Sequence, residues 1–321
     1  MKFNFFLLIA ILFFSPYSSS IEKTTIRLGV LAFGTVNWEL TTLKNQHLID
    51  DANFQLEIHP VANPQAGKIA LQSGAVDIIV ADWVWVSRLR STGSDFTFYP
   101  YSTTSGALIV AENSAIQSIK DLSGKKLGIA GGELDKNWLL LQALAQQKQL
   151  DLNTSVEKVY AAPPLLNQQI LHHRVDAIIN YWHFAAKLEA KGYRQLINGQ
   201  EILQELGISE TVPTLGYVFN LNWANQHKSL VNDFLKSTRL AKNKLCESDE
   251  VWQQIIPLTK VKDSVTQNKL RERYCAGRIK QWGKNEQQAA TKIYAILRQL
   301  SNNKLTGNSE NLQPNTFWTI D

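Results

Sequence analysis

Cysteine is scarce in this chain of 321 residues, since only Cys246 and Cys275 are present. No cysteine follows the apolar segment near the N-terminus, so no lipid attachment is expected there. A thiol catalyst or a metal site would need a base or further ligands nearby, and the nearest histidine, His227, stands 19 residues before Cys246. In an exported chain an isolated pair is most simply a disulfide, with two unpaired thiols as the alternative.

Long apolar runs are also lacking, apart from ten residues that end at Phe14. That run is too short for a membrane-spanning helix, which needs roughly 20 residues. A lysine precedes it, and Ser18 and Ser20 follow in a small-x-small pattern, which together predict a secretory signal peptide over residues 1–20. A retained amphipathic anchor is the alternative. We expect a mature periplasmic protein that begins near Ile21.

The chain has no block of basic residues and no motif typical of an enzyme. Its 33 lysines and arginines are scattered among 28 acidic residues. The net charge of +5 therefore indicates a mild excess of positive charge over the surface and not nucleic-acid binding. A nucleophile elbow, a phosphate-binding Walker loop and a metal-binding histidine or carboxylate spacing are all missing. The adjacent His172 and His173 point to different faces of an expected helix. We predict no catalytic residue, no metal and no cofactor.

Short apolar segments alternate regularly with amphipathic ones, which predicts α/β structure with parallel sheets covered by helices. A mature chain of roughly 300 residues favours two lobes over one core. We expect lobe one to comprise residues 21–104 and 214–303, where the segment from about Leu230 onward is a C-terminal helical extension. Residues 105–213 form lobe two, and residues 304–321 are expected to be a mobile polar tail.

One pattern occurs twice, as "SGAVDIIVADWVWVSR" at residues 73–88 and as "HRVDAIINYWHFAAK" at residues 173–187. In each copy a Val-Asp pair opens a buried strand, and the strand is expected to end in a loop that carries tryptophan. Because ligands in open α/β sheets bind outside the carboxyl ends of the strands, the two copies predict the two walls of one crevice.

The residues at the two strand ends are therefore candidate ligand contacts. Asp82 and Trp83 belong to the first wall, and Asn180, Tyr181 and Trp182 to the second. Indole faces stack on flat rings and attract cations, so an aromatic, heterocyclic or cationic solute is expected beside Asp82. Burial of the tryptophans in the core is the alternative.

Two further turns of lobe one supply candidates. Thr35 and Trp38 stand at the first strand-to-helix turn, where exposed amides could bind an anion. The alternative is an ordinary threonine cap with Trp38 in the core. Asn63 and Gln65 stand at the next strand end, and simple capping by Asn63 is the competing interpretation.

Several motifs resemble the periplasmic substrate-binding proteins of ATP-binding-cassette (ABC) importers, in the nitrate, sulfonate and taurine group that includes binders of thiamine pyrimidine precursors. The resemblance covers roughly residues 26–244, and "SIKDLSGKKLGI" is its most specific element. It implies a type II binding-protein fold, with two α/β lobes, two chain crossings and a ligand clamped between the lobes. The segments that carry it are "LQSGAVDIIVAD", "GALIVAENSAIQSIKDLSGKKLGIAGG", "NWLLLQAL" and "ILHHRVDAIINYW".

The resemblance adds further site residues. Ser105 lies near the crossing, where the group commonly contributes a hydroxyl or amide. In "GGELDKNW", Gly132, Asp135 and Asn137 stand where sulfonate and nitrate binders usually have glycine and hydroxyl residues. The carboxylates of Glu133 and Asp135 make a small, strong anion a poor candidate ligand.

The resemblance implies a monomer that binds a small molecule and docks on an inner-membrane ABC permease. "GTVNWEL", "GGELDKNWLLLQAL" and "APPLLNQQIL" are similar to a subset associated with pyrroloquinoline-quinone-dependent alcohol oxidation. The alternative function is therefore a periplasmic ligand-binding protein that serves a sensor or a quinoprotein dehydrogenase system.

Overall fold

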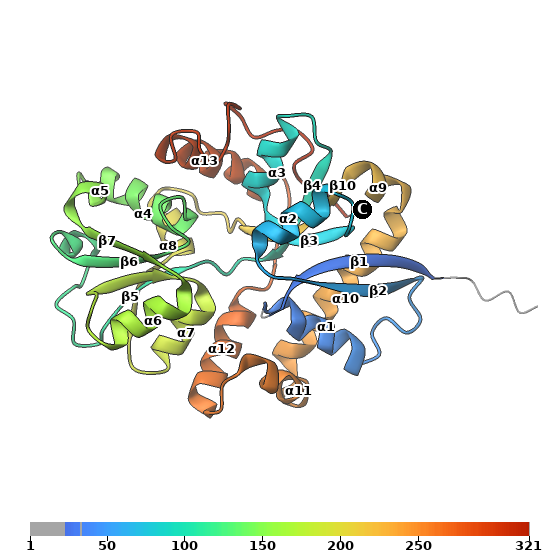
Figure 1. Cartoon of the computed structure of the whole chain (residues 1–321), viewed down its shortest axis with the longest axis horizontal. Coiled ribbons are helices and arrows are strands. Elements are labelled where there is room, and N and C mark those ends of the chain that lie inside the picture. Colours follow the sequence, from blue (N-terminus) through green and yellow to red (C-terminus); the bar gives the residue numbers. More distant parts are fainter. Residues whose placement is uncertain (1–22, 33, 321) are drawn as a thin grey trace, which may run out of the picture.

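The computed structural model describes residues 23–32 and 34–320 and shows two α/β lobes side by side (Figure 1). The expected signal peptide lies outside the described residues. Each lobe is built on one five-stranded sheet. Within the described part of the chain, no helix is long and apolar enough to cross a membrane.

Lobe one contains the first sheet, in the strand order β2-β1-β3-β10-β4. Strands β1, β2 and β3 are parallel, and β10 returns from the second half of the chain to pair antiparallel with both β3 and β4. The elements of this lobe are β1 (Thr24–Leu31), α1 (Val36–Asn45), β2 (Phe54–Val61), α2 (Pro64–Gln72), β3 (Ile78–Asp82), α3 (Trp83–Arg90), β4 (Phe96–Ser102) and β10 (Leu215–Asn220).

Lobe two repeats this arrangement in the order β7-β6-β8-β5-β9, where β5 pairs antiparallel with β8 and β9. The prediction of two α/β lobes with mostly parallel sheets is confirmed, and each sheet is mixed because one strand, β10 or β5, runs against the other four. The elements are β5 (Ala107–Val110), η1 (Ile119–Leu122), β6 (Lys126–Ala130), α4 (Lys136–Gln147), α5 (Leu152–Ser155), β7 (Glu157–Ala161), α6 (Pro163–Leu171), β8 (Ala177–Asn180), α7 (Trp182–Glu189), β9 (Arg194–Asn198) and α8 (Gly199–Glu205).

The repeated Val-Asp pair holds equivalent strands together in the two lobes. Asp77 accepts a hydrogen bond from the backbone N–H of Arg27 at 2.8 Å, and Asp176 accepts one from the backbone N–H of Lys126 at 2.8 Å. Each carboxylate therefore satisfies a strand-edge donor where the ladder of parallel bonds begins. Asp77 also binds the Arg27 guanidinium, with 3.1 Å from Nε to Oδ2. The pattern is thus a structural feature of both sheets.

The chain is helical after β10, as predicted, and the helices contact both lobes. Helices α10 and α11 pack on α1 of lobe one, while α12 packs on α7 and α13 on α4 of lobe two. In Figure 1, α13 and α12 lie on opposite sides of the region between the lobes, whereas α9 and α10 lie against lobe one. The C-terminal helices are α9 (Leu221–Gln226), α10 (Lys228–Glu247), α11 (Asp249–Thr259), α12 (Ser264–Ala276) and α13 (Lys284–Leu300).

The prediction of a mobile tail after residue 303 is wrong, because this segment packs on lobe one. Phe98 of β4 donates its backbone N–H to Thr316 and accepts one from Trp318, both at 2.8 Å. The Trp318 side chain is 5% exposed and packs edge-on against Phe219. Sequence composition suggested a polar tail, but the few aromatic residues at its end bury enough apolar surface to hold the segment.

Replacing Trp318 with alanine should lower the free energy of unfolding by about 3–5 kcal/mol, because a buried indole leaves a cavity that is only partly refilled. The neighbouring Thr319 is exposed, so Thr319→Ala should change stability by less than about 0.5 kcal/mol. Urea denaturation of both variants would measure the difference. Equal stabilities would show that the C-terminal segment is not part of the core.

Candidate functional site

The expected loop after β3 is absent, because α3 begins immediately at the strand end. Asp82 is its N-cap and accepts a hydrogen bond from the backbone N–H of Trp85 at 2.9 Å. The other carboxylate oxygen, Oδ2, lies 3.6 Å from Nζ of Lys68 and 3.4 Å from Nζ of Lys136. Lys68 belongs to α2 of lobe one and Lys136 to α4 of lobe two, so one buried carboxylate connects the two walls.

Asp82 remains a carboxylate because of these lysines. Burial is the largest single influence and favours the neutral acid, but the charges of Lys136 and Lys68 and the Trp85 amide together outweigh it. The pKa of Asp82 therefore lies below its usual value. Burial lowers the pKa of Lys68, and the charge of Asp82 opposes that shift.

The second wall gathers the predicted residues of lobe two around a glycine turn. Asp135 caps α4 by accepting hydrogen bonds from the backbone N–H groups of Asn137 and Trp138. Gly131, with φ of +80°, allows a close approach, since a Cβ there would lie 2.9 Å from Tyr181 Oη and 3.0 Å from Asp135 Oδ2. Asp135 and Tyr181 therefore face one another across this turn, and Gly132 follows it with φ of +83°.

Burial dominates the acid–base behaviour of this wall. It raises the pKa of Asp135 above its ordinary value, against the hydrogen bonds that favour the charged form. Burial, assisted by the charge of Asp135, raises the pKa of Tyr181 to about 12. The Tyr181 hydroxyl is therefore a neutral hydrogen-bond donor near pH 7.

Two of the predicted residues, Asn180 and Asn137, hold the backbone of lobe two in place through their side-chain amides. Asn180 is fully buried, donates to Pro163 O at 2.9 Å and to Asn167 Oδ1 at 2.8 Å, and accepts from the Tyr181 amide. Asn137 Oδ1 accepts the backbone N–H of Gly106 at 3.0 Å, which ties the chain crossing to α4. These amides hold the wall in place through bonds within the protein.

The predicted tryptophans occupy different environments. Trp83 is 2% exposed, and its indole N–H donates to the carbonyl of Pro213 at 3.0 Å. Trp38 is 5% exposed and lies in a cluster with Trp252 and Tyr274. Trp182 is half-buried and meets Trp38 edge-on across the lobe boundary, with 6.3 Å between ring centroids. Among these three indoles, Trp182 has the most surface available to a ligand.

The remaining candidates of lobe one lie at the turns. Thr35 is half-buried at the start of α1, with its hydroxyl 3.5 Å from Tyr101 Oη. Asn63 is exposed and caps α2 by accepting the Ala66 amide at 2.9 Å, and Gln65 is exposed beside it. The contacts of Asn63 are those of an ordinary N-cap.

A buried ionic network lies behind Thr35 and stiffens this wall. Glu39 is 1% exposed and accepts hydrogen bonds from Tyr217 at 3.2 Å and Tyr274 at 2.6 Å. Nζ of Lys242 lies 3.3 Å from Glu39 Oε1 and donates to the Tyr101 carbonyl at 2.6 Å. The network joins α1, β4 and β10 of lobe one to α10 and α12. These two C-terminal helices are therefore held to lobe one.

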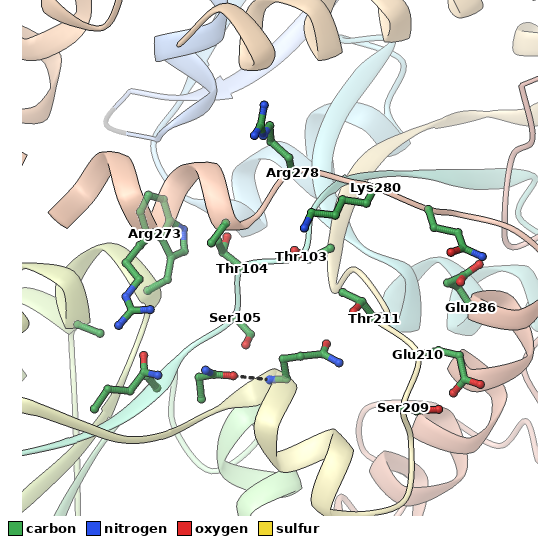
Figure 2. A pocket seen from close by; sticks show the side chains of 18 of the residues that line it. Thr103, Thr104, Ser105, Ser209, Glu210, Thr211, Arg273, Arg278, Lys280 and Glu286 are labelled. Carbon is green, nitrogen blue, oxygen red and sulfur yellow. Dashed lines mark hydrogen bonds between the residues drawn. The ribbon is translucent and has the colours of Figure 1, made fainter. Parts of the chain in front are cut away.

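A cavity of about 620 Å³ lies where the chain passes between the lobes (Figure 2). Residues 103–105 and 209–211 of the two crossings line it, together with Ala276 at the end of α12 and with Arg278, Lys280 and Gln281 of the segment between α12 and α13. Of the predicted residues, Ser105 and Trp182 line this cavity. Its volume is in the range that small-molecule sites occupy.

Sequence reasoning missed two charged residues of the site, Lys68 and Arg273. Lys68 lies on α2 after the Asn63 cap, and Arg273 lies in the segment that was expected only as a helical extension. Arg273 Nε donates to Glu189 Oε1 at 3.1 Å, which connects α12 to α7 of lobe two. Helical spacing from the Asn63 cap could have suggested Lys68, but nothing local indicates that α12 meets α7.

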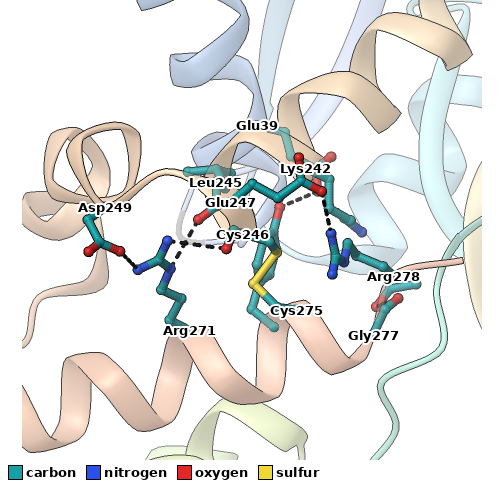
Figure 3. The surroundings of a disulfide bond; sticks show 12 residues. Glu39, Lys242, Leu245, Cys246, Glu247, Asp249, Arg271, Cys275, Gly277 and Arg278 are labelled. Atoms are coloured by element: carbon teal, nitrogen blue, oxygen red, sulfur yellow. Dashed lines mark hydrogen bonds and ion pairs between the residues drawn. A yellow bond between two sulfur atoms is a disulfide. The ribbon is translucent and has the colours of Figure 1, made fainter.

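The outer wall of the cavity is anchored by the only two cysteines. Cys246 and Cys275 form a disulfide that joins the end of α10 to the end of α12 (Figure 3). Arg271 on α12 donates to the carbonyls of Leu245 and Cys246, each at 3.2 Å. Arg278, which also lines the cavity, binds Glu247 at 2.9 Å. The disulfide and these bonds hold α12 to lobe one.

The polar side chains of this region are engaged within the protein. Within the ranges that the structure describes, no group of three or more histidine, cysteine or acidic side chains could hold a metal ion. The polar groups at the strand ends cap helices, pair with lysines or bind backbone. The two walls touch through Asp82 and Lys136 and through Trp38 and Trp182, as expected of two lobes in a closed arrangement.

Solved structures share this fold at low sequence identity. The periplasmic aliphatic sulphonate binding protein SsuA from Escherichia coli matches with a TM-score of 0.71 and 17% identity, over 90% of this chain and 95% of that one. The alkanesulfonate-binding protein SsuA from Xanthomonas axonopodis pv. citri matches with a TM-score of 0.67 and 17% identity, over 92% and 99%. A ligand-binding component of an ABC-type import system from Staphylococcus aureus matches with a TM-score of 0.63 and 16% identity, over 90% and 100%.

Fold and site therefore define a type II binding protein, with two lobes around a ligand-binding region. Residues 49–248 match the NMT1/THI5-like family, and the chain belongs to that family. No curated protein sequence matches the chain significantly. The predicted relationship to the NMT1-like family is confirmed, and the chain shares its fold with SsuA proteins at low sequence identity.

Asp82→Asn should lower the free energy of unfolding by about 3 kcal/mol at pH 7, because two partly buried lysines lose their shared counter-charge. The folded pKa of Asp82 is depressed, so this contribution is complete above the unfolded value of roughly 3.9 and is lost as the pH falls through the folded pKa.

Thermal unfolding of both proteins between neutral and acidic pH would measure the effect, with exposed Asp51→Asn as the charge-matched control. The gap between wild type and Asp82→Asn should close at low pH. A gap that is constant with pH would show that ionisation of Asp82 does not stabilise the fold.

Proposed function

We propose that this protein is the periplasmic solute receptor of an ABC import system. It binds one small organic molecule between its lobes, closes around it and docks on an inner-membrane permease as a monomer. Family membership and the two-lobed fold support this role. The solved relatives include proteins named for sulphonates and for ABC-type import.

The observation that carries the proposal is the contact of Lys136 of lobe two with Asp82 of lobe one at 3.4 Å. Separation of the lobes breaks this ion pair and exposes the carboxylate at the mouth of the crevice. A ligand that contacts both walls then stabilises the closed arrangement, because it supplies interactions that exist only when the walls are near each other.

The charges at the crevice favour a solute that is not a small, strong anion. Asp82 already engages Lys68 and Lys136, so neither ammonium is reserved for a ligand anion. A cationic or hydrogen-bonding group can compete with Lys136 for the Asp82 carboxylate as the lobes close. Trp182 and Ser105 both line the cavity of the crossings.

We therefore propose a flat aromatic or heterocyclic solute, neutral or cationic, with its ring on Trp182 and its polar group toward Asp82 and the Asp135–Tyr181 pair. The neutral Tyr181 hydroxyl would donate to an acceptor on the ring. The other residues that the sequence predicts as ligand contacts are proposed here as the supporting shell of this site: Thr35, Trp38, Asn63, Gln65, Trp83, Gly132, Asn137 and Asn180.

Native mass spectrometry of the protein purified from periplasm, followed by denaturing release, tests the proposal directly. We expect one small molecule per chain that raises the melting temperature when it is added back, because a ligand of the folded state stabilises it. Trp182→Ala should weaken binding about tenfold, which is about 1.4 kcal/mol. Trp223→Ala removes a half-buried indole of lobe one outside the site and should leave affinity unchanged.

The opposite result would be a protein that is empty and that shows no thermal shift with heterocycles, amines, sulfonates or carboxylates. That result would favour the alternative function, in which the protein binds a ligand for a sensor or a quinoprotein dehydrogenase system and takes no part in import. Equal loss of affinity in the two tryptophan variants would reject Trp182 as a ligand contact.

A further inference from the structure

A second cavity, of about 350 Å³, lies between lobe two and the C-terminal helices. Helices α6 and α7 form one side of it, and the turn between α11 and α12 forms the other. Neither crossing segment reaches this cavity, and none of the residues proposed to bind the solute lines it. It is therefore separate from the proposed solute site.

The cavity concentrates positive charge. Lys187 and Lys191 approach from α7 and the turn that follows it, and Lys260 and Lys262 approach from the α11–α12 turn. Asp263 is the single acidic residue among the lining residues. Both sides of the cavity therefore carry lysines, and the residues that line it have a formal excess of positive charge.

The carboxylate of Asp263 already accepts a hydrogen bond within the protein. Asp263 caps α12 by accepting the backbone N–H of Thr266 at 2.8 Å. Its pKa is lowered first by that amide and by the Thr266 hydroxyl, and only weakly by the charge of Lys191. The single negative charge of Asp263 therefore offsets only part of the positive charge of the four lysines.

The lysines also influence one another. Burial lowers the pKa of Lys187, and the nearby positive charge of Lys260 lowers it further. The Lys187 ammonium lies 5.8 Å from the Phe184 ring, which provides a weak attraction. Within the described part of the chain, the side chains of Lys191 and Lys262 form no hydrogen bond or ion pair, so both are available to a ligand.

We infer that this cavity is a binding site for a phosphate-type oxyanion. A doubly charged tetrahedral anion would contact lysines from both sides and replace their mutual repulsion with attraction. The exposed Gln168 lines the same space, and its side-chain amide can donate a hydrogen bond. The site takes either free phosphate or a phosphate group carried by a larger molecule.

The position of the cavity gives such an anion a structural consequence. Helix α7 belongs to lobe two, whereas α11 packs on α1 of lobe one and α12 is bonded to α10 by the disulfide. A bound anion would therefore link lobe two to the support of lobe one. Leu258 and Val265, which are 43% and 61% exposed, flank the same turn and offer apolar surface to the acyl chains of a phospholipid whose headgroup occupies the cavity.

Isothermal titration calorimetry with inorganic phosphate and with pyrophosphate at low salt tests the site. The wild-type protein should bind one anion, and Lys191→Gln combined with Lys262→Gln should weaken binding by at least about tenfold, since each contact is a charge-assisted hydrogen bond. Both lysines are exposed, so the variant should fold normally. Exposed Lys236→Gln on α10 removes one charge outside the cavity and should leave phosphate affinity unchanged.

Flotation with vesicles of phosphatidylcholine, with or without phosphatidylglycerol, identifies the source of the phosphate. Binding to phosphatidylglycerol vesicles that the double substitution abolishes would assign the site to a lipid headgroup, and binding of free phosphate alone would assign it to a soluble anion. The inference is overturned if neither probe binds, or if the double variant and Lys236→Gln bind each probe equally. None of these outcomes depends on the identity of the solute in the crevice.

Discussion

The structure depends on a single carboxylate that two lobes share. Asp82 ends the central strand of the first sheet, begins a helix of the same lobe and holds one lysine from each lobe. Since a buried charge is costly without partners, the closed arrangement needs both lysines near it. The pairing therefore joins the walls at the strand end, and the contact of Trp38 with Trp182 joins them at a second point.

Three kinds of contact brace this shared centre. The disulfide and the arginine contacts beside it hold α12 to α10, the buried Glu39 network holds the same helix to α1, and Arg273 carries the connection to α7 of lobe two. Helix α12 thus lies between the lobes as a rigid element. A motion that separates the lobes must change the α7–α12 contact as well as the strand-end pair.

Much of the fold could be predicted from the sequence, because the apolar strands and helix caps are local signals. The pattern placed a strand end at Asp82 and offered a cap at Asn63, and the structure has both, but the helix that begins after Asp82 was expected to be a loop. The Val-Asp repeat marks equivalent strands. The antiparallel insertion of β10 and β5 could not be predicted, because pairing partners are set by distant segments. Burial of Trp83 was equally hidden, since it depends on Pro213 and on Phe317 near the end of the chain.

The C-terminal contact with β4 also bears on how the chain reaches this structure. Lobe two is built from one continuous stretch, so it can fold while later residues are still being synthesised. Lobe one needs β10 from the middle of the chain and the segment around Phe317 from its end. Its core, including the surroundings of Trp83, is completed only after nearly the whole polypeptide is present, so lobe two is the natural first folding unit.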